Sequence, residues 1–538
     1  MKKTIFLFIL LWILVACKNN NDQILGAVSS AAPEASHAGE LILKKGGNAV
    51  DAAIAVSFTL AVTEPAMSGL GGGSQVLLSI KNQKPIAING TTFSPALTNA
   101  QSGDTLSYHR RSTIPSTVKV LDYLYRHYGS GKVTWEELVQ PAIGYAENGF
   151  EIGPFRAKVY KRYAEKLKSS PHNTHLFLID GRVPRLGEKL KQPILAKTLR
   201  RIAKFGADDF YKGEIAQSIA DDMRENQGWI SLEDLQRFPE PKELEPLTIA
   251  YRDHQVYSQP PPCGGWTALM IMKLLDVKSQ GNELGINDLI EALYLGQNDR
   301  RQHPVTDLID YEAQVAEKLS DVYIQNLLKS AVDSEDSAEI IKEGSGETTH
   351  FSVVDSEGTA IAVTASINAY FGSLAASERL GFLYNSYMDD FTFGDPEHPF
   401  ALQPNAMAYS SMSPTIVQKN KENVLVIGSP GSSRIISSVA QLSAEWIYDQ
   451  DISHLVKKPR IHVNRNRAYL EEKKDTLLVD KNLVQKYNLE FRVPNESLII
   501  YEQLNSYYGG IHAIAKEKSK WVGVADPRRD GLALIVKD

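Results

Sequence analysis

Residues 344–366 restrict the fold of this chain more than any other stretch, because they read as a flexible lead-in followed by two strands. "GSGE" at 344–347 has the composition of a loop, and the two following runs, "THFSVV" and "TAIAVTASI", alternate around the turn sequence "DSEG". The pattern predicts a β-hairpin that starts at Thr348. The polar, acidic stretch 329–347 before it has the strongest linker composition in the chain.

The chain changes its pattern at this hairpin. Residues 27–63 are rich in alanine and are expected to be helical, and residues 115–345 also read mostly as helices. After residue 348 the pattern is one of short strands, including "SSMSPTIVQ", "NVLVIGSPG" and "AYLEE". With 538 residues the chain could form two or three domains or one large layered domain. Helices followed by strands predict sheets covered by helices.

A glycine-rich turn, "SGLGGGS" at 68–74, comes directly before a strand expected over 75–80. A dinucleotide-binding turn needs a strand before its glycines and a helix after them, and the order here is the reverse. We therefore interpret the glycines as a tight turn that brings backbone close to another part of the molecule.

Thr348 is a candidate nucleophile because of its position. A threonine hydroxyl attacks weakly unless a base takes its proton. If the peptide bond between Glu347 and Thr348 is cut, the free amine of Thr348 lies beside its own hydroxyl and can act as that base. Such a cut needs a flexible lead-in and a rigidly held threonine, and this sequence offers both. The alternative is an ordinary loop-to-strand junction, since Thr favours strands and Gly-Ser favours loops.

The first residues read as a secretory signal. Two lysines precede an apolar run over 5–16 that is too short for a comfortable membrane span. Small residues followed by Cys17 look like a bacterial lipoprotein box, which predicts a signal peptide over 1–17 and a lipid on Cys17. The protein would then be exported and held at a membrane, facing the periplasm or anchored in the outer membrane. The alternative is a plain signal peptide with an incidental cysteine.

Charge and cysteine content argue against several classes of function. The formal net charge is -6 and there is no strong basic run, so nucleic acid is not an expected partner. The chain has 2 cysteines, and a lipid on Cys17 would leave Cys263 without a disulfide partner. Neither a cysteine pair with zinc spacing nor an HExxH motif is present, so no metal is expected.

Several sequence motifs resemble those of the γ-glutamyltranspeptidase family of N-terminal-nucleophile hydrolases, and they occur in the family's order and at similar spacings. They are "GGNAVDAAIAVSFTLAVTEPAMSGLGGGS" (46–74), "TTHFSVVDSEGTAIAVTASIN" (348–368), "YNSYMDDF" (384–391), "SSMSPTIV" (410–417) and "GSPGSSRI" (428–435). The resemblance runs from about residue 25 to the end. It implies an α+β fold, the four-layer αββα sandwich, built as one interleaved domain from a large subunit (18–347) and a small subunit (348–538).

The resemblance also implies a mechanism. The precursor cleaves itself between Glu347 and Thr348, and the two fragments remain together as a heterodimer. Thr348 then forms an acyl-enzyme with a γ-glutamyl amide such as glutathione and passes the acyl group to water or to an acceptor amine. The partners are therefore small molecules, and no cofactor is implied.

The resemblance assigns roles to further residues. Ser366 falls where the family commonly has a second Thr near the amine of the nucleophile. Asn368 and Asp390 match substrate contacts, and the Asp390 carboxylate would pair with the α-ammonium of a glutamyl group. Ser410 and Ser411 match hydroxyls that bind the substrate carboxylate. In isolation, Asp390 could equally be an ordinary strand-end aspartate and the two serines a capped turn.

Gly431 and Ser432 match the Gly-Gly oxyanion hole of the family, in which two backbone N–H groups face the developing negative charge. Donors of this kind are worth roughly 10²–10³-fold in rate. Ser432 replaces the second glycine but keeps its N–H, so the hole can be retained if the backbone there tolerates a side chain.

A departure from the family concerns the recognition of a carboxylate. The family's transpeptidases have an arginine that binds the α-carboxylate, but Ala100 falls near that position and no arginine lies between Lys84 and His109. A guanidinium has no equal substitute for binding a carboxylate through two hydrogen bonds. Arg110 or Arg111 could reach the site from a different loop.

Tyr387 is a second departure, because the family usually has a Gln or an acid there that helps to hold the α-amino group. These changes leave an alternative function open, an amidase of the same fold with another acyl group, cephalosporin-acylase-like or poly-γ-glutamate-cleaving. An inactive surface lipoprotein that only binds is a third hypothesis. His350 shares the face of Thr348 on an ideal strand, and we interpret it as structural, because the α-amine already supplies the base.

Overall fold

The computed structural model describes residues 23–279, 281–329, 340, 346–494 and 504–538. The predicted signal peptide, Cys17 and most of the predicted linker lie outside these residues.

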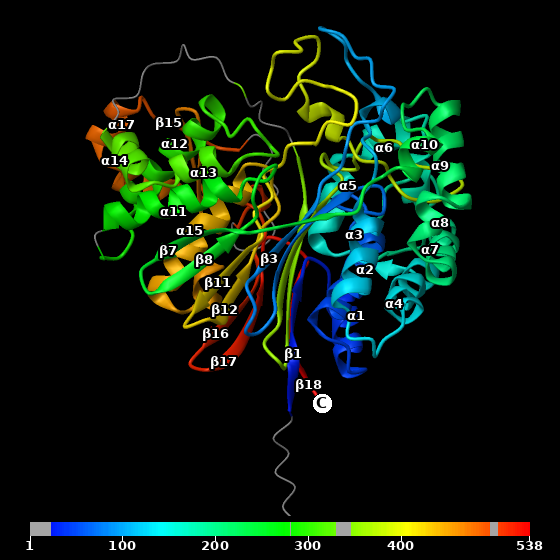
Figure 1. Cartoon of the computed structure of the whole chain (residues 1–538), viewed down its shortest axis with the longest axis horizontal. Coiled ribbons are helices and arrows are strands. Elements are labelled where there is room, and N and C mark those ends of the chain that lie inside the picture. Colours follow the sequence, from blue (N-terminus) through cyan, green and yellow to red (C-terminus); the bar gives the residue numbers. More distant parts are fainter. Residues whose placement is uncertain (1–22, 280, 330–339, 341–345, 495–503) are drawn as a thin grey trace, which may run out of the picture.

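Two antiparallel sheets stack face to face at the centre of the molecule (Figure 1). The first sheet has seven strands in the order β18 (Leu532–Lys537), β1 (Ile24–Ser30), β9 (Thr349–Asp355), β10 (Ala360–Ser366), β2 (Gly73–Ser79), β3 (Ile86–Gly90) and β6 (Lys242–Leu244). The second has six, in the order β17 (Lys520–Ala525), β16 (His512–Glu517), β12 (Glu422–Ile427), β11 (Thr415–Lys419), β8 (His254–Ser258) and β7 (Leu247–Tyr251).

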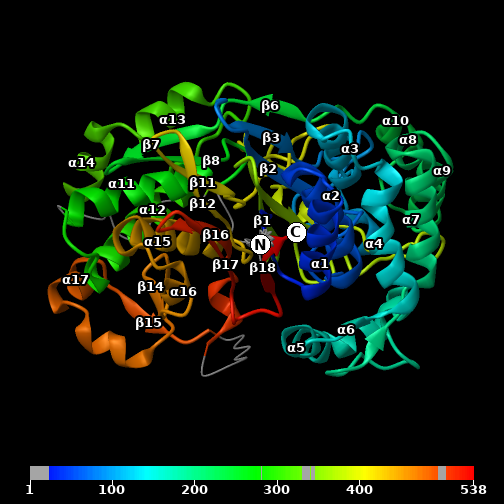
Figure 2. The same cartoon turned by 90° about the horizontal axis from the view of Figure 1, so that it is seen from below.

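Helices cover the outer face of each sheet, as Figure 2 shows from below. On the side of the first sheet lie α1 (Pro33–Lys44), α2 (Ala49–Thr63), α3 (Thr117–Tyr128), α4 (Trp135–Asn148), α5 (Pro154–Arg162), α6 (Ala164–Ser169), α7 (Pro193–Phe205), α8 (Ala207–Tyr211), α9 (Glu214–Glu225) and α10 (Leu232–Gln236). On the side of the second lie α11 (Gly265–Ser279), α12 (Ile286–Gln302), α13 (Glu312–Lys318), α14 (Asp321–Lys329), α15 (Arg434–Asp449), α16 (Ile452–Leu455) and α17 (Lys481–Lys486).

Two small sheets complete the fold. One pairs β13 (Ile461–Asn464), β14 (Arg467–Leu470) and β15 (Glu490–Arg492), and the other pairs β4 (Phe150–Glu151) with β5 (Lys189–Leu190). Short 3₁₀ turns lie at η1 (Tyr108–Arg111), η2 (Thr174–Phe177), η3 (Tyr387–Asp390), η4 (Lys473–Leu478) and η5 (Ser506–Tyr508).

The four layers follow from strands whose two faces are both buried. Successive side chains of a strand point to opposite faces. In β1, Ala27 packs between the two sheets while Val28 packs against the helices. In β10, Ala362 likewise packs between the two sheets and Val363 packs against the helices. The predicted αββα sandwich is therefore confirmed.

The beginning of the expected helical run is a strand, so this prediction was wrong. Residues 27–63 were expected to be helical, but β1 occupies their start and only α1 and α2 are helices. β1 hydrogen-bonds to β18 on one side and to β9 on the other. Gly26 and the β-branched Ile24 and Val28 are poor helix formers, so the composition of "ILGAVSS" and its pairing on both edges both favour a strand.

The expectation of helices over 115–345 was incomplete. Helices dominate this part, but the three strands β6, β7 and β8 interrupt them and join the central sheets. In β7 and β8 buried residues recur at every second position. That alternation was the available signal, although the strands are short.

Strands from both sides of Glu347 alternate within the sheets. In the first sheet β1 lies between β18 and β9, and β2 is paired with β10. In the second sheet β8 is paired with β11. The segments before and after Glu347 therefore share a continuous hydrogen-bonded framework.

The glycine-rich turn brings backbones close together, as its sequence predicts. A Cβ atom at Gly72 would lie 2.2 Å from the carbonyl oxygen of Ser366, and one at Gly71 would lie 2.2 Å from that of Leu383. Only glycine leaves room for these approaches. The turn therefore sets the positions of Ser366 and of the segment after Leu383, both of which carry predicted site residues.

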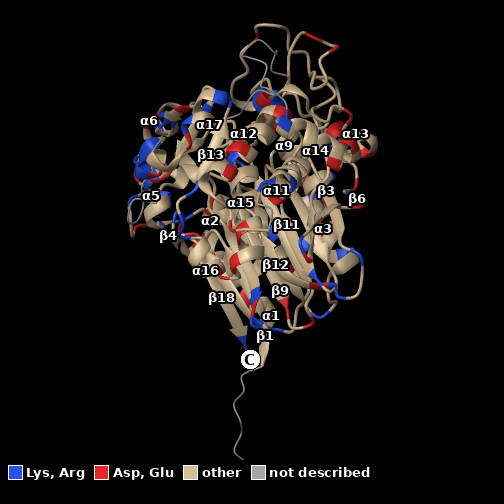
Figure 3. Cartoon of the chain, turned by 90° about the vertical axis from the view of Figure 1, so that its left-hand side faces the viewer, with Lys and Arg blue, Asp and Glu red and all other residues tan. Residues whose placement is uncertain are grey.

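Acidic and basic residues are interspersed over the face shown in Figure 3. Among the helices that the structure describes, none is long and apolar enough to cross a membrane.

Candidate active site

Most of the predicted site residues gather around a single small pocket. Its volume is about 60 Å³, and it is lined by Thr348, Ser366, Asn368, Tyr387, Asp390, Ser410, Ser411 and Ser432, with Gly346, Arg300, Tyr409 and Phe400 among its other neighbours. The predicted residues Gly431 and Glu347 do not line the pocket themselves, but each is the chain neighbour of a residue that does, Ser432 and Thr348. Residues from several separate segments after Glu347 therefore meet at one pocket, as the resemblance implies.

Thr348 stands directly before β9, a strand in the middle of the first sheet. In the ladder between β9 and β10, Thr349 is paired with Ala365, so Thr348 and Ser366 extend the same ladder from its end. Thr348 is buried, with 5% of its surface exposed. The hairpin thus holds Thr348 rigidly at the edge of the pocket, as the sequence predicts.

The carbonyl group of Glu347 is held by a hydroxyl from the adjacent strand. Ser366 Oγ donates a hydrogen bond of 2.6 Å to the Glu347 carbonyl oxygen, and the Glu347 N–H donates to the carbonyl oxygen of Asn368. A donor at this oxygen makes the carbonyl carbon a better target for a nucleophile. This is the carbonyl that Thr348 would attack during self-cleavage.

The side chain of Glu347 is fixed by two arginines. Arg434 Nη2 lies 3.1 Å from one carboxylate oxygen and Arg529 Nη2 lies 2.9 Å from the other. Glu347 and Arg529 are almost completely buried. Because the partners are charged and enclosed, these bonds are stronger than those of an exposed pair. The residue before the predicted cut is therefore anchored on both sides of its carboxylate.

Asn368 and Asp390 act as a unit at one end of the pocket. Asn368 Nδ2 donates to Asp390 Oδ2 at 3.1 Å and to the carbonyl oxygen of Ser386. Burial raises the pKa of the Asp390 carboxyl to about 8, and the negative charge of neighbouring Asp389 acts in the same direction. Without a cationic ligand, Asp390 is largely protonated at neutral pH.

The two arginines suggested as substitutes do not line this pocket. Arg111 forms an ion pair with Asp389, and Arg110 donates to the carbonyl oxygen of Gln227 while lying over the ring of Trp229. Ala100 packs beside the apolar cluster that includes Tyr387. The suggestion that Arg110 or Arg111 reaches the site was therefore wrong, because other groups hold both side chains.

Arg300 is a pocket residue that sequence reasoning missed. It comes from α12, and its Nη2 donates to Ser411 Oγ at 2.9 Å and to the Ser410 carbonyl oxygen at 3.5 Å. Its guanidinium lies over the ring of Tyr409, 5.0 Å from the centroid. Within "QNDRRQ" at the end of a helix, nothing in the sequence distinguishes it from a surface arginine.

The turn with Gly431 and Ser432 tolerates the serine. Ser432 has φ 54° and Gly431 has φ 120°. Both angles lie in the region that favours glycine, and a serine there costs roughly 1–2 kcal/mol. The turn keeps two successive backbone N–H groups, and the side chain of Ser432 lines the pocket. Their predicted role as an oxyanion hole remains a prediction.

His350 lies between the sheets, away from the residues that line the pocket. Its Nδ1 is 2.9 Å from Thr364 Oγ1 and its Nε2 is 3.1 Å from Ser352 Oγ. Burial holds the pKa of the imidazole well below its usual value, so the ring is neutral. These contacts support the structural interpretation of His350. Cys263 is also buried, and burial raises the pKa of its thiol, which makes it unreactive.

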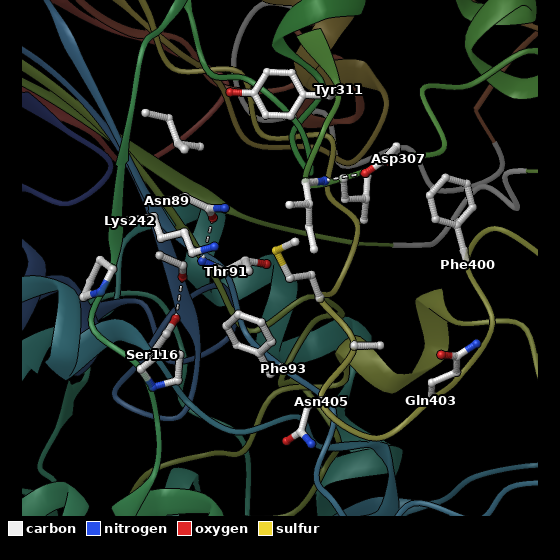
Figure 4. Close-up of a pocket in the computed structure, with 18 of the residues that line it drawn as sticks. Asn89, Thr91, Phe93, Ser116, Lys242, Asp307, Tyr311, Phe400, Gln403 and Asn405 are labelled. Carbon is white, nitrogen blue, oxygen red and sulfur yellow. Dashed lines mark hydrogen bonds between the residues drawn. The ribbon is translucent and has the colours of Figure 1, made fainter. Parts of the chain in front are cut away.

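A larger cavity of about 740 Å³ adjoins the pocket (Figure 4). Phe400 lines both, while Phe93, Tyr311 and Lys242 belong to the larger cavity alone. None of the predicted site residues lines it. In the part of the chain that the structure describes, no cluster of His, Cys, Asp and Glu side chains could hold a metal ion.

Comparisons with known proteins agree with this geometry. A family profile described as Gamma-glutamyltranspeptidase matches residues 35–536. The chain is 35% identical over 481 residues to the glutathione hydrolase proenzyme of Escherichia coli (strain K12), covering 81% of this chain and 80% of that protein. It is 28% identical over 517 residues to the capsule biosynthesis protein CapD proenzyme of Bacillus anthracis, covering 94% and 89%. Among solved structures, cephalosporin acylase from Bacillus halodurans has a TM-score of 0.81 at 25% identity, covering 95% and 96%.

The anchoring of Glu347 leads to a prediction about stability. Glu347→Gln removes the negative charge that Arg434 and Arg529 share, and breaking a buried ion pair costs about 3–5 kcal/mol of the free energy of unfolding. Urea unfolding of the uncut Thr348→Ala chain, with and without Glu347→Gln, measures this loss.

The hydrogen bond from Ser366 leads to a prediction about self-cleavage. Ser366→Ala removes the donor to the carbonyl under attack and should slow cleavage on the order of 10²-fold. The rate at which the full-length band disappears on a denaturing gel measures this effect.

Ser366→Thr, which keeps the hydroxyl, is the matched control and should cleave at nearly the original rate. If Ser366→Ala were to cleave as fast as the unaltered chain, the proposed activation of the carbonyl by Ser366 would be wrong.

Proposed function

The chain belongs to the γ-glutamyltranspeptidase family, and on this premise we propose that it is cut after Glu347 and uses Thr348 as the nucleophile of a glutathione hydrolase-type enzyme. The observation that carries the proposal is the pocket in which Thr348, Asn368, Asp390 and Ser432 meet.

The first reaction converts the single chain into two subunits. Thr348 Oγ attacks the Glu347 carbonyl carbon, and Ser366 Oγ stabilises the negative charge that develops on the carbonyl oxygen. The C–N bond breaks as the nitrogen takes up the proton that Thr348 Oγ loses, so that the nitrogen becomes the free amine of Thr348 and the acyl group moves to Thr348 Oγ. Water then hydrolyses this ester. The names of the relatives, which describe proenzymes, support this step.

The second reaction transfers an acyl group. The free amine of Thr348 takes the proton of its own hydroxyl as Oγ attacks the γ-carbonyl of the substrate. The N–H groups of Gly431 and Ser432 stabilise the oxyanion. The proton then passes to the leaving amine, and water or an acceptor amine releases the acyl group from Thr348. Asp390, held by Asn368, pairs with the α-ammonium of the glutamyl group.

One observation favours the alternative, an amidase that acts on a different acyl group. No arginine lies in the segment 84–109, and the solved cephalosporin acylase matches the whole fold. The pocket beside Thr348, with a volume of about 60 Å³ in the uncut chain, is small enough that only a short acyl group would be held there in either case.

We also propose that Cys17 carries a lipid and holds the protein at a membrane. The sequence before Cys17 supports this, because an apolar run that ends in small residues directly precedes the cysteine. Mass spectrometry of the mature N-terminus decides the point, because an unmodified terminus that starts elsewhere contradicts it.

The main proposal predicts two bands on a denaturing gel of the purified protein. The smaller should begin at Thr348, as read by N-terminal sequencing, and Thr348→Ala should remain a single chain. The processed enzyme should release p-nitroaniline from γ-glutamyl-p-nitroanilide. A fully processed enzyme that cleaves other acyl anilides but not this one would show that the γ-glutamyl assignment is wrong.

The raised pKa of Asp390 predicts a pH dependence. Asp390 is neutral below about pH 8 and charged above it, and only the carboxylate pairs with an ammonium group. The kcat/KM for γ-glutamyl-p-nitroanilide, divided by that for glutaryl-p-nitroanilide, should therefore rise as pH increases toward about 8, and it should fall again at higher pH where the α-ammonium of the substrate loses its proton. The ratio removes the titration of the Thr348 amine, which both substrates share. In Asp390→Asn the ratio should be low and independent of pH, and a persisting rise would exclude Asp390 as its cause.

A further inference from the structure

Arg300 is a buried cation that lacks a matching carboxylate. Only 4% of its surface is exposed. Among the described residues, its contacts are the Ser410 carbonyl oxygen, the Ser411 hydroxyl and the face of the Tyr409 ring, and none of these carries a full negative charge. Its Nε is buried and has no hydrogen-bond partner in the part of the chain that the structure describes. A buried guanidinium in this condition is costly unless an anion joins it.

The contacts of Arg300 direct it toward the pocket. Ser410, Ser411 and Tyr409 all line the same pocket as Thr348, and so does Arg300 itself. Arg300 therefore stands behind the serine pair and beside the space that an acyl group attached to Thr348 would occupy. An anion in this space would meet a guanidinium and two serine residues together.

The pocket also carries the complementary charge on a separate element. Asp390 belongs to η3, whereas Arg300 belongs to α12, and the two do not form an ion pair with each other. Burial disfavours the charged form of Asp390 in the empty pocket. A ligand with an ammonium and a carboxylate on one carbon atom would satisfy both groups at once.

We propose that Arg300 binds the carboxylate of the substrate's glutamyl group and replaces the arginine that is absent from the segment 84–109. The inference rests on the proposed acyl-transfer function of this pocket. Arg300 comes from a helix, so its backbone is held more rigidly than that of a loop residue. The planar guanidinium can donate to the carboxylate while it keeps its bond to Ser411.

The proposal makes the acyl substrate an amino acid with a free α-carboxylate. It also separates two requirements, since Arg300 responds to the carboxylate and Asp390 to the ammonium group. A substrate that lacks one of these charges should lose the contribution of one residue only.

Three p-nitroanilides test this separation with the fully processed enzyme. The γ-glutamyl compound carries both charges, the glutaryl compound carries only the carboxylate, and the 4-aminobutyryl compound carries only the ammonium group. In Arg300→Met, kcat/KM for the first two should fall about 10- to 100-fold, the range for losing a hydrogen bond to a charged group. The loss should appear mainly in KM, and the third substrate should lose far less, because Arg300 acts on it only through its charge near Asp390.

Arg300→Lys should recover part of the loss on the carboxylate substrates, because it keeps the charge but not the planar fork. If Arg300→Met is not cut or unfolds early on heating, Arg300→Lys serves as the test variant in its place. Arg301→Met is the matched control, since Arg301 is a neighbouring buried arginine of α12 that does not line the pocket. It should not change the ratio between substrates.

Equal losses on all three substrates would overturn the proposal, because they would show that Arg300 supports the pocket without binding the carboxylate. An unchanged kcat/KM for the glutaryl compound would overturn it as well. If the unaltered enzyme cleaves the glutaryl but not the γ-glutamyl compound, the γ-glutamyl assignment fails while Arg300 is still judged on the glutaryl compound. If the unaltered enzyme accepts neither carboxylate, both ideas fail.

Discussion

The ion pairs of Glu347 hold together the parts from which this site is built. Arg434 opens α15 directly after the turn with Gly431 and Ser432, and Arg529 lies between the last two strands of the chain. Both donate to the carboxylate of Glu347, which immediately precedes Thr348. One buried carboxylate therefore sets the position of the chain junction relative to the candidate oxyanion turn and to the loop between β17 and β18. Removing its charge would affect three distant segments of the chain together.

The charges around the pocket show how a site can be prepared for a zwitterion. Asp390 and Arg300 are each enclosed, and neither neutralises the other. In the empty pocket the carboxyl reduces its cost by keeping its proton, while the guanidinium relies on two serines and an aromatic ring. Binding of an amino acid end would pair each with an opposite charge. The enzyme would then recognise its substrate because binding gives two buried ionisable groups, Asp390 and Arg300, an oppositely charged partner each.

Much of the site could be predicted from the sequence, because its motifs lie at loop-to-strand junctions and at turns. The hairpin after Thr348 and the close approach at Gly72 follow from local patterns, whereas the gathering of Asn368 and Asp390 was implied by the resemblance to the family. Two features could not be predicted in this way. β1 lies at the start of an alanine-rich stretch, and its partners β18 and β9 come from distant parts of the chain. Arg300 reaches the pocket because α12 packs behind the serine pair, which is a tertiary fact with no local signature.

The interleaving of strands has a consequence for the lifetime of the protein. While the chain is intact, β1 and β9 find each other within one molecule. After a cut at Glu347 the same pairing would require two molecules to meet, and each fragment alone would expose several unpaired strand edges. The cut enzyme would persist because its unfolding is slow, and an unfolded sample would not return to the native state as the precursor does. The stability of the cut enzyme would therefore be kinetic, because its native structure forms while the precursor is still a single chain.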